Sequence, residues 1–219
     1  MSSKKCYDVI LFDLDGTLTD PKVGITKAVA YALHHLGIEV KELDELCPFI
    51  GPPLKECFME FYQFSEEEAM KAIGYYREYF MEYGMFENKV YPGMRFLLQE
   101  LKSRGKKLVV ATLKPTALAV DILKYFELIP YFDLVVGSEP EVRNTKGKVI
   151  HYALEEMKIR DLDKVVMVGD RKHDCIGAKE EEIDCIGVLY GYGGIEELQQ
   201  AGATEMVETV EELCKRLAE

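Results

Sequence analysis

Two aspartates separated by one residue form the first chemically significant pattern in this sequence. Asp13 and Asp15 follow the apolar run of residues 9–12, and Gly16 comes directly after them. Side chains two residues apart on an extended chain point to the same side, and a glycine lets the chain turn sharply beyond them. The two carboxylates are therefore expected to share one pocket. There one of them can hold a cation or accept a phosphoryl group while the other transfers protons.

A second pair of carboxylates, Asp170 and Asp174, follows another apolar run at residues 165–168. Ligands of open α/β sheets bind beyond the carboxyl ends of the strands, so carboxylates from two strands are expected to converge there. Such clusters repel one another unless a divalent cation neutralises them. Mg²⁺ keeps waters and a substrate phosphate beside a couple of carboxylates, which fits Asp13 and Asp170 better than a dedicated Ca²⁺ cage does.

Five short, almost continuously apolar runs supply the elements that position these residues. Their lack of polar alternation predicts strands buried on both faces, as in a parallel sheet. The runs are residues 9–12, 108–111, 134–136, 165–168 and 185–189. From residue 92 onward the segments between them carry helical signals, so the predicted fold class is α/β. Residues 201–219 are interpreted as a plain closing helical region.

Residues 20–88 interrupt this alternation. An amphipathic helical stripe runs from Ile25 to Leu36 and ends at Gly37, and no convincing strand follows it. Ser65 and Glu68 have the spacing of a capping box, which predicts the start of a second long helix that extends to about residue 83. We therefore predict an all-helical insert over residues 20–88 in a core formed by residues 1–19 and 89–219.

The composition excludes several classes of protein. The 219 residues include 27 Lys and Arg against 39 Asp and Glu, which gives a formal net charge of −12. Such a chain repels phosphate backbones and anionic lipids, so neither nucleic acid nor a membrane is an expected partner. The six cysteines are scattered without a C-x-x-C pair and are predicted to be reduced thiols. The apolar stretch of residues 9–12 is too short for a signal peptide, and we expect a cytoplasmic protein.

Two motifs carry a resemblance to a known family. The sequence D-L-D-G-T-L-T-D at residues 13–20, after V-I-L-F, and G-D-R-K-H-D at residues 169–174 resemble the first and fourth motifs of haloacid dehalogenase superfamily phosphatases. The resemblance covers the whole chain and implies a Rossmann-like parallel sheet core with a helical cap inserted after the first strand. The first motif and I-G-P-P-L at residues 50–54 resemble the phosphoglycolate-phosphatase-like branch, which includes members assigned as 5′-nucleotidases.

The resemblance implies a role for each acidic residue. Asp13 would be the nucleophile, and Asp15 the general acid that protonates the leaving alcohol and then activates water. Asp13, the backbone carbonyl of Asp15 and Asp170 would hold Mg²⁺, the expected cofactor. Asp174 would support this set from the second shell, for example through a metal-bound water.

Four further polar residues are weighed for phosphate binding on the same resemblance. Thr112, at the end of the second predicted strand, matches the phosphate-binding Ser or Thr of the family. A lysine of the family pairs with the nucleophile and the phosphate; Lys146 is the best match, and Lys148 is its rival because the segment lacks the common K-P-x-P. Leu113 stands where many members carry a polar residue, so whether Lys114 faces the phosphate stays open.

These motifs predict a Mg²⁺-dependent phosphomonoesterase that hydrolyses a small phosphorylated metabolite through an aspartyl-phosphate. Phosphoglycolate and nucleoside 5′-monophosphates are the expected substrates, and the protein is expected to be a monomer or a homodimer. One alternative is a sugar phosphomutase of the same superfamily, in which the phosphoryl group returns to the sugar. The other is a non-catalytic binding protein on this fold.

Two glycine-containing loops also have informative sequences. The sequence Y-G-Y-G-G at residues 190–194 partly resembles a dinucleotide loop but lacks the full glycine spacing, so we predict a tight turn beside the active site. Residues 50–54 are rigid at their prolines and lie between helices of the insert. Both a substrate-directed loop and a simple inter-helix turn fit them.

Overall fold

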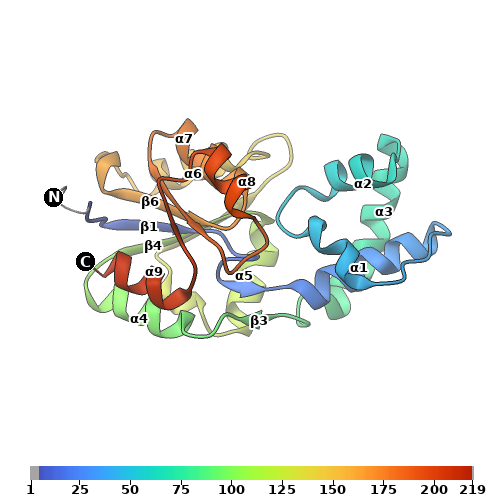
Figure 1. Cartoon of the computed structure of the whole chain (residues 1–219), viewed down its shortest axis with the longest axis horizontal. Coiled ribbons are helices and arrows are strands. Elements are labelled where there is room, and N and C mark those ends of the chain that lie inside the picture. Colours follow the sequence, from blue (N-terminus) through green and yellow to red (C-terminus); the bar gives the residue numbers. More distant parts are fainter. Residues whose placement is uncertain (1–4, 219) are drawn as a thin grey trace. The chain divides into compact units, whose positions relative to one another are not determined.

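The computed structural model describes residues 5–218. The chain divides into two compact units, Met1–Thr19 with Val90–Glu219, and Asp20–Lys89. The ends of the predicted core, residues 1–4 and 219, lie outside the described residues. Figure 1 shows that the larger unit combines a sheet with helices, whereas the smaller unit is built of helices.

The larger unit is organised around a parallel sheet with the strand order β5-β4-β1-β6-β7-β8. Its strands are β1 Val9–Phe12, β4 Lys107–Pro115, β5 Leu134–Ser138, β6 Val165–Gly169, β7 Asp184–Val188 and β8 Glu205–Val207. The chain starts in the middle, builds outward in one direction and then returns to build outward in the other. This is the doubly wound, Rossmann-like order, so the predicted fold class is confirmed.

Helices cover both faces of the sheet. They are α4 Met94–Ser103, α5 Thr116–Tyr125, α6 Lys146–Glu156, α7 Lys172–Glu180, α8 Ile195–Ala201 and α9 Val210–Leu217. Short 3-10 helices lie at Ile129–Tyr131 and Leu162–Lys164. In Figure 1, α6, α7 and α8 lie on one side of the sheet and α4 and α9 on the other. All four residues of β1 are buried, as expected for a strand covered on both faces.

The core explains why the apolar runs become central strands. Val9 and Leu11 of β1 belong to one hydrophobic cluster with Val149 and Ile150 of α6 and Cys175 of α7. Burial of each large apolar side chain contributes about 1.5–3 kcal/mol. This cluster fixes α6 and α7 against the same face of the sheet, and both helices carry polar residues at their first turns.

The closing region differs from the prediction. Residues 201–219 are not purely helical, because β8 lies between α8 and α9 and extends the sheet by pairing with β7, with Val188 opposite Val207. Three residues are too few to show an alternating or continuously apolar pattern. The pairing with β7, formed by residues distant in the sequence, is what makes this segment a strand.

The smaller unit is helical. Residues 21–88 contain no strand, and only its two end residues, 20 and 89, belong to strands. Its elements are α1 Lys22–His35, a 3-10 helix at Leu43–Phe49, α2 Leu54–Tyr62, α3 Glu66–Tyr79 and a π-helix at Phe80–Gly84. The capping box at the start of α3 is present, since Ser65 Oγ accepts from the N–H of Glu68 and the Glu68 carboxylate accepts from the N–H of Ser65. Phe49 and Phe58 pack edge-to-face with ring centroids 5.0 Å apart.

The chain passes between the two units through two short paired segments. β2 Thr19–Asp20 and β3 Lys89–Val90 form a separate two-stranded sheet. Lys89 Nζ also lies 3.1 Å from the Asp20 carboxylate. The outgoing and returning segments are therefore held side by side.

Candidate active site

The register of the central strands brings their polar ends to one edge of the sheet. Phe12 of β1 lies opposite Val110 of β4 and Val168 of β6, so the residues after these three positions emerge together. β4 continues to Pro115, so Thr112 and Lys114 lie within its last residues. The N–H of Asp13 donates to the carbonyl of Val168 at 2.9 Å, which continues the strand pairing into the first motif. Beyond it the chain turns at Gly16, whose φ of +84° lies in the left-handed region that glycine tolerates.

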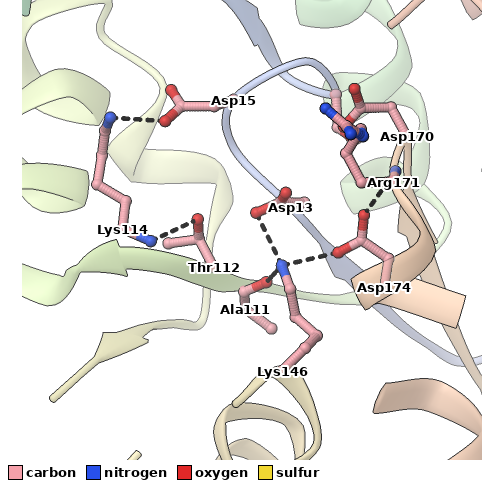
Figure 2. Close-up of polar contacts among 10 residues, drawn as sticks. Asp13, Asp15, Ala111, Thr112, Lys114, Lys146, Asp170, Arg171 and Asp174 are labelled. Atoms are coloured by element: carbon pink, nitrogen blue, oxygen red, sulfur yellow. Dashed lines mark hydrogen bonds and ion pairs between the residues drawn. The ribbon is translucent and has the colours of Figure 1, made fainter. Parts of the chain in front are cut away.

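Lys146, the first residue of α6, lies at the centre of the site. Its Nζ is 2.9 Å from Asp13 Oδ1 and 2.7 Å from Asp174 Oδ1, and it donates to the carbonyl of Ala111 at 3.0 Å (Figure 2). Lys148, its rival, is exposed and donates to Asn144 Oδ1. The structure therefore brings Lys146, and not Lys148, to the first motif.

Close packing of two helices lets Lys146 reach this position. A Cβ added at Gly177 of α7 would lie 2.7 Å from the backbone nitrogen of Gly147 and 2.8 Å from Lys146 Cβ. Only a residue without a side chain allows α7 to approach the start of α6 this closely. The same approach brings Asp174, one turn earlier on α7, to the lysine.

Asp170 and Asp174 are buried beside the first motif. Asp170 accepts from Thr17 Oγ1 at 3.3 Å and from the N–H of Tyr192 at 2.8 Å. Asp174 Oδ2 accepts from the N–H of Arg171 at 3.1 Å. One carboxylate oxygen from each of Asp13, Asp170 and Asp174 lies within 4.8 Å of the others, a spacing at which all three could hold one metal ion.

Thr112 and Lys114 lie near the end of β4, and Lys114 contacts Asp15. Lys114 Nζ is 2.6 Å from Asp15 Oδ2, and the N–H of Lys114 donates to Thr112 Oγ1 at 3.2 Å (Figure 2). The lysine side chain is only 8% exposed. Lys114 therefore points at the second aspartate of the motif.

Comparison with known proteins identifies the family. Residues 10–188 match the sequence model of the haloacid dehalogenase-like hydrolases. The chain belongs to this family. A crystal structure of a predicted phosphatase from Clostridium acetobutylicum is 51% identical, with a TM-score of 0.93 over 97% of this chain and 98% of that one.

Two curated relatives show the range of names within this similarity. A 5′-nucleotidase of Pseudomonas aeruginosa is 44% identical over 88% of this chain and 87% of its own length. The tyrosine-protein kinase PtkA of Mycobacterium tuberculosis is 34% identical over 95% of this chain and 72% of its own length. Together with the family match, the similarity to a 5′-nucleotidase and to a predicted phosphatase makes this chain a phosphatase of the haloacid dehalogenase superfamily.

Among residues 5–218, no helix is both long and apolar enough to cross a membrane.

The electrostatics of this haloacid dehalogenase-like hydrolase are dominated by burial. Burial raises the pKa of Asp170 well above its usual range, and the neighbouring charges of Asp174 and Asp13 raise it further. Burial also raises the pKa of Asp15, although the Lys114 ammonium opposes that shift. For Lys146, burial would lower the pKa, but the charges of Asp13 and Asp174 outweigh it and raise the pKa overall.

The donor set fits a hard divalent cation. Four buried carboxylates, those of Asp13, Asp15, Asp170 and Asp174, face two lysines, so the ionised cluster carries an excess of two negative charges. Lys146 contacts two of the three carboxylates that could share one ion, those of Asp13 and Asp174. A divalent ion would balance that charge in a site that offers only oxygen ligands.

Two contacts in the site were not predicted from the sequence. Tyr192 donates its N–H to Asp170, and Thr17 donates its hydroxyl to the same carboxylate. Thr17 lies in the first motif, so its position was a usable signal. The N–H of Tyr192 has no such signal, because a backbone donor leaves no mark on residue type.

Proposed function

We propose that this hydrolase is a Mg²⁺-dependent phosphomonoesterase that acts on a small phosphorylated metabolite through an aspartyl-phosphate on Asp13. One observation carries the proposal: Asp13 and Asp15 share the motif but have different partners. Lys146 holds Asp13, and Lys114 holds Asp15. Two neighbouring carboxylates in different environments can divide nucleophilic and acid–base work between them.

In the first step an Asp13 carboxylate oxygen attacks the phosphorus, and the bond from phosphorus to the leaving alcohol oxygen breaks. Asp15 gives its proton to that oxygen, so a neutral alcohol departs. Burial raises the pKa of Asp15, which is the direction that a general acid requires. Thr112 and Lys146, at the same edge of the sheet, bind the phosphoryl oxygens.

In the second step a water attacks the phosphorus of the aspartyl-phosphate. Asp15, now ionised, takes the proton of the water, and the bond between phosphorus and Asp13 breaks to release inorganic phosphate. Lys146 stays beside Asp13 throughout and stabilises its carboxylate as leaving group.

The cofactor part of the proposal rests on the acidic cluster. Asp13, the backbone carbonyl of Asp15 and Asp170 would hold Mg²⁺, with Asp174 supporting them. When bound, the ion neutralises charge on the phosphoryl group during transfer. The fit of the buried oxygen donors to a divalent cation supports this assignment.

The helical unit of residues 20–88 is proposed to be a cap that opens and closes over the reaction. Its chain enters and leaves through the paired segments β2 and β3, which can serve as a two-stranded hinge. Closure would exclude water while the phosphoryl group transfers to Asp13. The loop of residues 50–54, which leads into α2, is proposed to contact the substrate.

We propose a nucleoside 5′-monophosphate as substrate, and phosphoglycolate as the other candidate. The similarity to the 5′-nucleotidase of Pseudomonas aeruginosa supports the former. The decisive experiment measures phosphate release from a set of phosphorylated metabolites with Mg²⁺ and with EDTA, for the wild type and Asp13→Asn.

We expect Mg²⁺-dependent release from one of these substrates and none from the variant. Label from H₂¹⁸O should appear in the released phosphate. Transfer of the phosphoryl group to a second hydroxyl without release would instead show a phosphomutase. Absence of any turnover with Mg²⁺ would contradict the proposal and favour a binding protein.

A further inference from the structure

The loop of residues 190–194, between β7 and α8, lies against the site but has no part in the mechanism above. Two of its contacts bear on one carboxylate. The N–H of Tyr192 donates to Asp170 Oδ2 at 2.8 Å. The hydroxyl of Tyr190 donates to the carbonyl of Thr17 at 3.2 Å, and Thr17 in turn donates its own hydroxyl to Asp170 Oδ1. The loop thus acts on both oxygens of Asp170, on one directly and on the other through Thr17.

The anchor of the loop is the ring of Tyr190. This ring packs at a steep angle on that of Tyr91, with centroids 4.9 Å apart. Burial raises the pKa of Tyr190 well above its usual range, so its hydroxyl remains a donor. A partly buried, hydrogen-bonded tyrosine therefore fixes the first residue of the loop to the turn of the first motif.

Two glycines set the distance between the loop and Asp170. A Cβ added at Gly191 would overlap Asp170 Cβ and would lie 2.5 Å from the carbonyl oxygen of Gly16. A Cβ added at Gly193 would overlap the carbonyl oxygen of Asp170, which is backbone and cannot rotate away. Gly194, the next residue, has open space around its Cβ position and an ordinary φ of −91°.

We propose that the loop of residues 190–194 is a backbone clamp that positions Asp170 for a divalent cation, with Gly191 and Gly193 as positioning residues. An N–H that donates to one carboxylate oxygen fixes the orientation of the whole group. A carboxylate that is already fixed in the binding orientation loses no conformational entropy when the ion binds. This inference rests on the proposed function, because it takes Asp170 to be a metal ligand.

The neighbouring glycines offer a matched pair of variants. We expect Gly193→Ala to weaken the binding of Mn²⁺, used as a paramagnetic substitute for Mg²⁺, by about 10–100-fold. Gly194→Ala adds the same methyl group one residue further on. The affinity of this variant for Mn²⁺ should stay within about twofold of the wild type. Affinity is measured on the full chain by electron paramagnetic resonance of free Mn²⁺, and circular dichroism checks the fold.

Kinetics provide a second measurement on the same variants. Gly193→Ala should raise the Mg²⁺ concentration for half-maximal activity, while kcat at saturating Mg²⁺ recovers to within about threefold. A purely structural defect would lower kcat at every Mg²⁺ concentration. Unchanged Mn²⁺ affinity in Gly193→Ala would overturn the clamp.

A third variant covers the case in which Gly193→Ala does not fold. Tyr190→Phe adds no atoms and removes the bond to Thr17, and we expect it to weaken Mn²⁺ binding by about threefold. Unchanged affinity in that variant would then overturn the clamp. If the wild type itself binds no Mn²⁺ or Mg²⁺, the metal part of the proposed function fails. If the wild type binds and the loop variants bind equally well, only the clamp fails.

Discussion

The two lysines of the site hold the two aspartates of the first motif in different ways. Lys146 comes from the first turn of a helix, is 3% exposed and is shared between Asp13, Asp174 and a backbone carbonyl. Lys114 comes from the end of a strand and lies against Asp15. A change at Lys146 therefore disturbs the balance of buried charge in the whole cluster, whereas a change at Lys114 acts mainly on Asp15.

This difference matches the separate tasks of Asp13, which must stay in one position, and Asp15, which must change its protonation state. In the proposed reaction Asp13 keeps one position while its bond to phosphorus forms and breaks. Asp15 gains and loses a proton in every cycle. A lysine with three oxygen partners suits the first task, and a lysine that contacts the proton carrier suits the second. Five predictions test this comparison.

The largest effect is expected for Asp13→Asn, on the Lys146 side. The amide is a far poorer nucleophile and cannot form the acyl-phosphate, so turnover should fall by at least about 10³-fold. The rate of phosphate release from one substrate measures the loss of turnover, and circular dichroism checks that the variant is folded. Activity within about tenfold of the wild type would remove Asp13 from the role of nucleophile.

Lys146→Met should come next and should affect both activity and stability. It leaves Asp13 and Asp174 buried without their cation, so we expect about a 10³-fold loss of kcat/KM and a destabilisation of about 3–5 kcal/mol. Lys148→Met is the matched control, because Lys148 is exposed, and it should stay within about 0.5 kcal/mol of the wild type. Urea unfolding and steady-state kinetics compare the two. The reverse order would transfer the role to Lys148.

Asp15→Asn tests the other side of the comparison. We expect a loss of about 10²–10⁴-fold with alkyl phosphates, whose leaving oxygen needs a proton. The loss should be smaller with aryl phosphates, whose leaving groups depart without one. Equal losses for the two substrate types would argue against Asp15 as the general acid.

Lys114→Met should cost less, about tenfold in kcat, because it acts through Asp15. A double-mutant cycle sharpens the point: in the Asp15→Asn background the same change should cost almost nothing. Additive losses would show that Lys114 has a separate function, such as direct contact with the phosphate.

The smallest expected effect is on stability, and it concerns the cation that the carboxylates of the site would share. A divalent cation that binds only the folded state stabilises it by about 2.7 kcal/mol at a hundred times its dissociation constant. For a chain of this size that corresponds to a rise in Tm of about 5–10 °C over the EDTA-treated protein. Asp170→Asn should reduce the rise, and differential scanning calorimetry measures both. An undiminished rise would place the cation elsewhere.

The sequence by itself determined the residues that follow strands. Asp13, Asp15, Thr112 and Asp170 each follow an apolar run, and parallel strands end at a common edge, so local patterns were enough to predict their convergence. A helical insert is predicted in the same way, because the alternation of apolar runs and helical segments stops at residue 20 and resumes after residue 88. In both cases the signal lies within a few residues of the feature that it predicts.

Only the tertiary structure decided which partner each of these residues has. Lys146 and Lys148 are two residues apart and alike in type; Lys146 faces Asp13 because α7 packs on the start of α6 at Gly177. β8 is a strand because β7 pairs with it. The contact from Tyr192 to Asp170 joins residues 22 positions apart through a backbone N–H. Such contacts depend on the packing of distant segments and on backbone atoms that every residue shares, so the pattern of residue types near each site residue does not predict its partner.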